Sequence, residues 1–124
     1  MIRWACKRYG LKLMPTVKQH DGGSYAWSFT PDDDTLRPAI SIQARTQKNT
    51  PTALHEAAHV VADRIFEGDA QNHGPEFLGV YMALLIDAEV APAAALHATA
   101  LEHKLKWLPY EQIGPTAIRA RRSS

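Results

Sequence analysis

Three residues of one segment have the types and spacing of a catalytic metal site. His55 and His59 lie four positions apart, and Glu56 directly follows the first histidine. On a helix, residues at this spacing differ by roughly 40° in azimuth and about 6 Å along the axis, so both imidazoles can reach one ion. Glu56 lies about 100° round the helix from His55, where its carboxylate can reach a water molecule on the metal. The segment predicts a zinc site with Glu56 as the general base.

A catalytic zinc site has three protein ligands and one open position, so a third ligand must come from elsewhere in the chain. His73 is the predicted third ligand, because a short loop after Gly68 can bring it back to the first helix. Gly74 is expected to allow a sharp turn beside this ligand, and Pro75 to begin the next helix. The prediction is a three-histidine site for one catalytic Zn²⁺ ion.

The two histidine segments together resemble a known family. HEAAH at 55–59, followed after a short loop by HGPEF at 73–77, is similar to the SprT-like metalloprotease domain, and the likeness covers roughly residues 24–87. The resemblance implies a zincin-like protease core that cleaves protein or peptide substrates, with the three histidines as zinc ligands and Glu56 as the catalytic acid/base. No cysteine-rich zinc ribbon follows the core, so the DNA-linked role of larger family members is implied only weakly.

Strands are expected before the first histidine motif. Segment 11–17, which Pro15 interrupts, suits an edge strand that need not donate at every position. Segment 39–43 alternates with period 2 and should pair antiparallel with segment 24–29. Segment 24–29 places three aromatic residues on one face, which is expected to pack in the core: Tyr25, Trp27 and Phe29.

Helices are expected after the strands, because the apolar period changes from 2 to 3.6. Their predicted ranges are 50–67, a second helix from Pro75 onward, and 92–108. The predicted fold class is α+β, with a small antiparallel or mixed sheet packed against the HExxH helix and two further helices. One protease domain at 1–110 is expected, followed by a C-terminal basic tail at 111–124.

The charge balance bears on binding partners. Fourteen Lys and Arg residues against thirteen Asp and Glu residues leave a formal charge of +1, so the whole molecule has no field that would attract nucleic acid or an anionic membrane. A local DNA contact is predicted only through Arg119, Arg121 and Arg122, for which a solvated tail is the favoured interpretation. The oligomeric state is left open.

The chain is expected to be a cytoplasmic protein with no membrane association. Cys6 is the only cysteine, so no intramolecular disulfide can form, which fits a reducing compartment. No stretch approaches 18 apolar residues, and charge interrupts the N-terminal segment by residue 3.

The predicted function is a zinc-dependent metalloendopeptidase that hydrolyses peptide bonds in flexible protein segments, including those of DNA-associated proteins. One alternative is a non-catalytic module in which zinc stabilises a protein- or DNA-binding fold, although Glu56 argues against a purely structural site. Another is an HExxH peptidase that cleaves a single regulatory protein. Segment 38–43 is the predicted strand edge for substrate.

The sequence offers several candidates for each of the other supporting roles. The donor to a developing oxyanion is one of Tyr81, His97, His103 or Tyr110. A carboxylate that orients a zinc-bound imidazole would be Asp63, Glu67 or Glu76. Trp27 and Trp107 are candidates to border the cleft, with core packing as the favoured interpretation of both.

Overall fold

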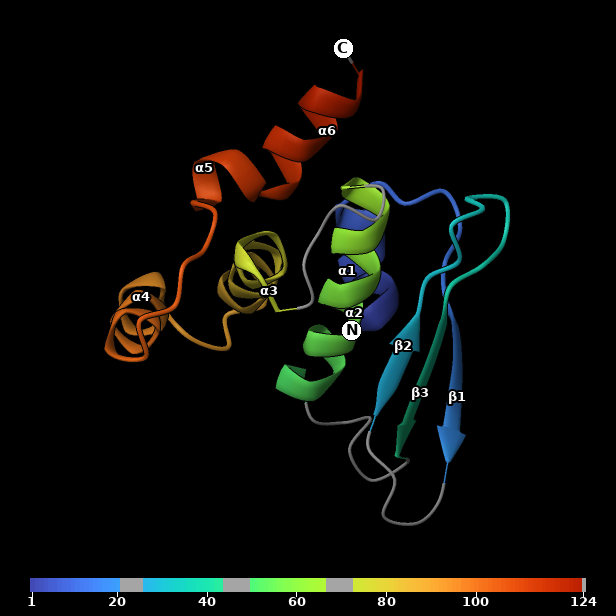
Figure 1. The fold of residues 1–124 in the computed structure, drawn as a ribbon, viewed down its shortest axis with the longest axis horizontal. Coiled ribbons are helices and arrows are strands. Elements are labelled where there is room, and N and C mark those ends of the chain that lie inside the picture. Colours follow the sequence, from blue (N-terminus) through green and yellow to red (C-terminus); the bar gives the residue numbers. More distant parts are fainter. Residues whose placement is uncertain (21–25, 44–49, 67–72, 124) are drawn as a thin grey trace.

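The computed structural model describes residues 1–20, 26–43, 50–66 and 73–123 (Figure 1). Within these ranges the predicted α+β class is confirmed by a three-stranded sheet and six helices. None of these helices is long and apolar enough to cross a membrane. The elements in chain order are α1 (Ile2–Arg8), β1 (Thr16–His20), β2 (Trp27–Phe29), β3 (Ala39–Gln43), α2 (Thr50–Ile65), α3 (Pro75–Asp87), α4 (Ala93–Glu102), α5 (Tyr110–Ile113) and α6 (Pro115–Ser123).

The sheet is mixed and has the order β1-β3-β2. β2 pairs antiparallel with β3, as predicted, whereas β1 pairs parallel with β3. β1 is an edge strand, but it begins at Thr16 rather than near Leu11. Thr16 donates its backbone N–H to the Pro38 carbonyl over 2.9 Å, which Pro15 cannot do because proline has no N–H. Strand pairing therefore starts just after the proline.

The aromatic face of β2 does not pack in the core, contrary to the prediction. Trp27 and Phe29 are 52% and 62% exposed. The register explains why, because the residue paired with the buried Ile40 is Ser28, between the two aromatic residues. In Figure 1, α1 and α2 lie on one side of the sheet. Side chains alternate along a strand, so Trp27 and Phe29 lie on the face of β2 opposite to Ser28. Tyr25 lies outside the described residues.

α2 and α3 begin where the sequence predicts. α2 begins at Thr50, and its predicted end near Glu67 and Gly68 lies outside the described residues. α3 begins at Pro75, with Gly74 as its N-cap. Small buried residues of α2, such as Ala57 and Ala58, let α1 and α3 approach this helix closely, and these elements share one apolar core with Ile40 of the sheet.

α4 ends earlier than predicted, at Glu102 instead of residue 108. Lys104 has a left-handed backbone with φ 57°, and the Leu105 N–H donates to the Ala100 carbonyl over 2.8 Å. This six-to-one hydrogen bond is the Schellman closure that terminates a helix. The apolar spacing continues past Lys104, but the backbone leaves the helix there.

The stretch predicted as a C-terminal basic tail contains all of α5 except Tyr110, and all of α6, and these helices pack on the rest of the chain. Ile113 and Ile118 are 0% and 1% exposed and belong to the common core. The Tyr9 hydroxyl of α1 donates to the Ile113 carbonyl over 2.9 Å, and the Arg119 guanidinium donates to the Lys7 carbonyl over 3.0 Å. These contacts join the end of the chain to α1.

Gly79 in α3 is expected to resist substitution. A Cβ at this position would lie 2.8 Å from the carbonyl oxygen of Leu108, whose segment crosses α3 and donates its N–H to the Pro75 carbonyl. Gly79→Ala should lower the free energy of unfolding by about 1–3 kcal/mol through this overlap. Helix propensity alone would raise the free energy of unfolding by about 1 kcal/mol. Urea unfolding of both proteins gives the sign of the change in this free energy, and the sign decides between the two effects.

Candidate metal centre

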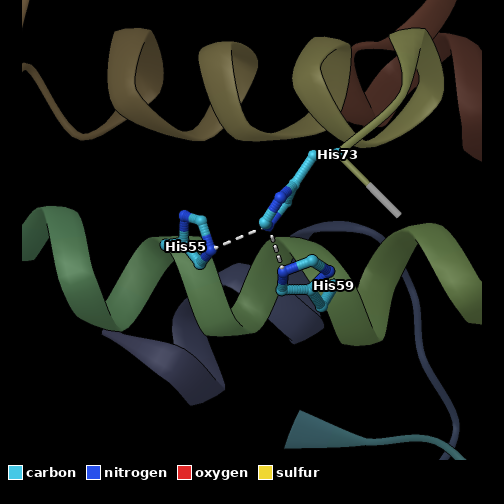
Figure 2. A group of neighbouring side chains, drawn as sticks. All are labelled: His55, His59 and His73. Carbon is cyan, nitrogen blue, oxygen red and sulfur yellow. Dashed lines mark hydrogen bonds between the residues drawn. The ribbon is translucent and has the colours of Figure 1, made fainter. Parts of the chain in front are cut away.

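Three histidine side chains converge at one point between α2 and the start of α3 (Figure 2). The Nε2 atom of His73 lies 3.0 Å from Nε2 of His59 and 3.3 Å from Nε2 of His55. In a tetrahedral zinc site, Zn–N bonds of about 2.0–2.1 Å place two ligand nitrogens about 3.3 Å apart. The three Nε2 atoms are therefore placed to bind one ion, as the sequence predicts.

Their surroundings favour the neutral form of the two helix imidazoles. Burial lowers the pKa of His59 to about 4, with further contributions from His55 and His73. Burial also lowers the pKa of His55, with a smaller contribution from His73. Neutral imidazole is the form that binds metals, so neither residue must lose a proton near neutral pH before it can act as a ligand.

The sharp turn beside the third ligand lies at His73 itself, not at Gly74 as predicted. His73 has φ 59°, in the left-handed region, whereas Gly74 has φ −79° and ψ −172°, which any residue can adopt. Left-handed backbone is uncommon outside glycine, although histidine is among the residues enriched there. The turn directs the His73 side chain toward the two histidines of α2, while α3 begins just after it (Figure 2).

Glu56 lies beside the three histidines without joining them. Its side chain is buried, and its Oε2 atom lies 4.0 Å from Nε2 of His55. Burial raises the pKa of Glu56, and a hydrogen bond with the Ser28 side chain of β2 opposes this rise. A carboxylate at this distance can reach a molecule bound near the histidines, and a raised pKa makes it a stronger base.

A cleft of about 470 Å³ runs between β2 and α2 and contains the histidines. Its position corrects the predicted substrate edge at 38–43, because β3 is the central strand and pairs on both sides. Among the described strands, β2 has the unpaired edge that borders the cleft. The residues that line the cleft are Ala26, Trp27, Ser28, His55, Glu56, His59, Ala62, Asp63, His73 and Phe77.

Of the four open candidates for an oxyanion donor, the structure brings only Tyr81 near the site. Its ring centroid lies 5.3 Å from that of His55, and its hydroxyl donates to the Pro51 carbonyl over 3.2 Å. Tyr110 donates to Asp87, and His97 stacks on Trp107 with ring centroids 5.0 Å apart. His103 is the exposed C-cap of α4. Of the two tryptophans proposed for the cleft border, Trp27 lines it and Trp107 does not.

The predicted orienting carboxylates are not bonded to the imidazoles in the described part of the chain. Asp63 lines the cleft, and burial raises the pKa of its carboxyl group. Glu76 is in the first turn of α3, and its Oε2 atom is buried with no hydrogen-bond partner. Glu67 lies outside the described residues. None of the three has a described contact that orients a histidine.

Two residues of the site were not assigned a role from the sequence. Ser28 bonds Glu56, and the period-2 alternation that grouped Trp27 with Phe29 also placed Ser28 on the opposite face. Phe77 entered the sequence analysis only as the last residue of HGPEF, yet it lines the cleft. The spacing within HGPEF does not show this contact, because His73 lies before α3 with a left-handed backbone and the neighbour rule for a helix does not apply to the pair.

The basic residues predicted for DNA contact lie far along the chain from this cleft, in α6. Arg119 donates to the Lys7 carbonyl, and Arg121 is exposed. The Arg122 side chain lies outside the described part. DNA binding by these residues stays a prediction.

No family model matches the chain, and no curated protein or solved structure matches it.

Proposed function

We propose that this protein is a zinc-dependent metalloendopeptidase of the HExxH type, which hydrolyses peptide bonds in flexible protein segments. The observation that carries the proposal is the convergence of three histidines, in which Nε2 of His73 lies 3.0 Å from that of His59 and 3.3 Å from that of His55. The buried carboxylate of Glu56 lies 4.0 Å from Nε2 of His55. Imidazole nitrogens suit zinc, whereas calcium and magnesium prefer oxygen ligands. Three protein ligands also leave the fourth position of a tetrahedral ion open, as catalysis requires.

In the proposed mechanism the metal ion acts as a Lewis acid and Glu56 transfers the proton. Zinc held by the three histidines would polarise the scissile carbonyl and make a water molecule more acidic. Glu56 would accept a proton from the attacking water and then deliver it to the leaving amine. The hydrogen bond with Ser28 holds the carboxylate beside the histidines throughout. The net reaction consumes one water and leaves a carboxylate and an amine.

The cleft supports an extended substrate. Among the described strands, β2 is an edge strand whose free side presents backbone groups beside the three histidines, and a peptide strand added there would cross them. Trp27 and Phe29 provide exposed aromatic surface along this strand. A peptide in this position must be extended, which supports flexible protein segments as substrates. The resemblance to the SprT-like metalloprotease domain extends the proposal to segments of DNA-associated proteins.

Metal removal tests the proposed function. Cleavage of an unstructured protein such as casein should fall to background after zinc is removed with a chelator. One equivalent of zinc should restore it, and magnesium should not, because the site offers three nitrogen ligands. Full activity of the metal-free protein would contradict the proposal. A protein that binds zinc tightly but cleaves no unstructured protein would favour the non-catalytic binding module.

A further inference from the structure

Phe77 contacts every histidine of the metal centre. Its ring centroid lies 4.2 Å from that of His59 at an interplanar angle of 25°, a stacked arrangement. It also lies 5.1 Å from the His55 ring and 4.9 Å from the His73 ring, in tilted or edge-on geometry. The Phe77 side chain is 3% exposed, so the surrounding core holds the ring in place. One rigid side chain thus touches three imidazoles that come from two separate segments.

Metal-binding imidazoles normally require a partner that sets their orientation. The usual partner is a carboxylate or carbonyl group that accepts a hydrogen bond from the ring nitrogen away from the metal. Among the described residues, the hydrogen bonds of His55, His59 and His73 involve only their Nε2 atoms, which point at one another. Their Nδ1 atoms have no described acceptor. Within the described part of the chain, these rings are therefore held by packing contacts.

We propose that Phe77 is a positioning residue, which orients the three imidazoles for metal binding by stacking and edge contacts in place of hydrogen bonds. The inference rests on the metal centre of the proposed function. Stacking on Phe77 restricts rotation of the His59 ring about its Cβ–Cγ bond, so that Nε2 stays directed at the other two nitrogens. An imidazole bound to a cation is electron-poor, so the face of the phenyl ring also favours the metal-bound state over the free one.

The Phe77 ring is itself packed against a second aromatic ring of α3, that of Tyr81. The Tyr81 ring lies 5.8 Å from Phe77 and 5.3 Å from His55, and its hydroxyl donates to the Pro51 carbonyl in α2. Tyr81 is four residues after Phe77, so both rings lie on the same face of α3. α3 therefore presents two adjacent rings, Phe77 and Tyr81, to the histidines of α2. Of these two rings, Phe77 is the one that contacts His55, His59 and His73.

The test compares zinc affinity in variants with and without the ring. The dissociation constant for zinc is measured by competition with a chromophoric chelator in the wild type, Phe77→Leu and Phe77→Tyr. Leu84→Ala is the matched control, because Leu84 is a fully buried residue of the same helix that does not line the cleft. Cobalt(II) absorption of each variant reports whether the ligand geometry is retained.

Phe77→Leu should weaken zinc binding by about 10-fold to 100-fold, the usual loss when a partner that orients a metal ligand is removed. Its cobalt spectrum should also change. Phe77→Tyr should keep the wild-type spectrum and most of the affinity, and Leu84→Ala should lose stability but not affinity. If Phe77→Leu does not fold, Phe77→Met replaces it as a ring-free variant that fills more of the volume.

Two results would overturn the inference. One is wild-type zinc affinity in a folded ring-free variant, and the other is an equal loss of affinity in Leu84→Ala, which would show a general effect of core stability. Unchanged affinity in a ring-free variant that still cleaves casein would leave the protease proposal standing. Conversely, a ring-dependent affinity in a wild type that cleaves nothing would support Phe77 positioning and contradict the proposed function.

Discussion

Glu56→Gln is expected to abolish peptide cleavage while zinc stays bound. Gln has the size of Glu and can keep a hydrogen bond with Ser28, but it cannot accept the proton of an attacking water. Loss of a general base typically costs about 100-fold to 10,000-fold in rate. The initial rate of casein cleavage is compared at equal zinc content, so that a change in rate reports on the proton transfer alone.

Glu102→Gln provides the control for Glu56→Gln. Glu102 is the exposed last residue of α4 and lies outside the cleft, so this variant should cleave at the wild-type rate. Wild-type cleavage by Glu56→Gln would contradict the assignment of Glu56 as the base. Loss of zinc from Glu56→Gln would show instead that Glu56 helps to hold the metal.

His73→Ala is expected to weaken zinc binding more than any substitution outside the ligand set. Removing an orienting partner of a ligand costs about 10-fold to 100-fold in affinity, so removing the ligand itself should cost more than about 100-fold. The fold should survive, because His73 is exposed and outside the apolar core. Zinc affinity is measured by chelator competition, and folding is followed by circular dichroism.

His73→Gly separates loss of the ligand from a backbone effect. His73 has φ 59°, which Gly adopts without strain, so the Gly variant should be at least as stable as His73→Ala while losing the same zinc affinity. His97→Ala is the matched control, because His97 stacks on Trp107 away from the cleft. Unchanged affinity in both His73 variants would show that the third ligand is another residue.

The part of the site on α2 is predictable because its geometry is local. The spacing of His55 and His59 places both on one helix face whatever surrounds the helix, and Thr50-Pro51 marks where that helix begins. Pro75 marks the start of α3 in the same way. Local rules fail at Lys104, where apolar spacing continues but a left-handed residue ends the helix. A periodic pattern records which faces are apolar and does not record where the backbone turns.

The position of β2 beside the cleft depends on the whole fold. The alternation of segment 24–29 shows that Trp27 and Phe29 share a face, but the face that meets the helices is set by the pairing with β3. Strand order is equally non-local, because β1 pairs with β3 although β2 lies between them in the sequence. The sequence alone therefore could not show that Trp27 and Phe29 are exposed, or that β2 rather than β3 has the edge next to the metal centre.

The sequence by itself determined which residues could carry the proposed chemistry, and the tertiary structure decided how those residues are arranged. The residue types and spacing of His55, Glu56 and His59 predict a metal site and a base, because a helix brings them together through local geometry. Only the fold shows how His73 turns back through its own left-handed backbone and how Phe77 packs against all three imidazoles. These contacts join α2 to a separate segment, and packing between separate segments depends on the whole core rather than on either stretch of sequence.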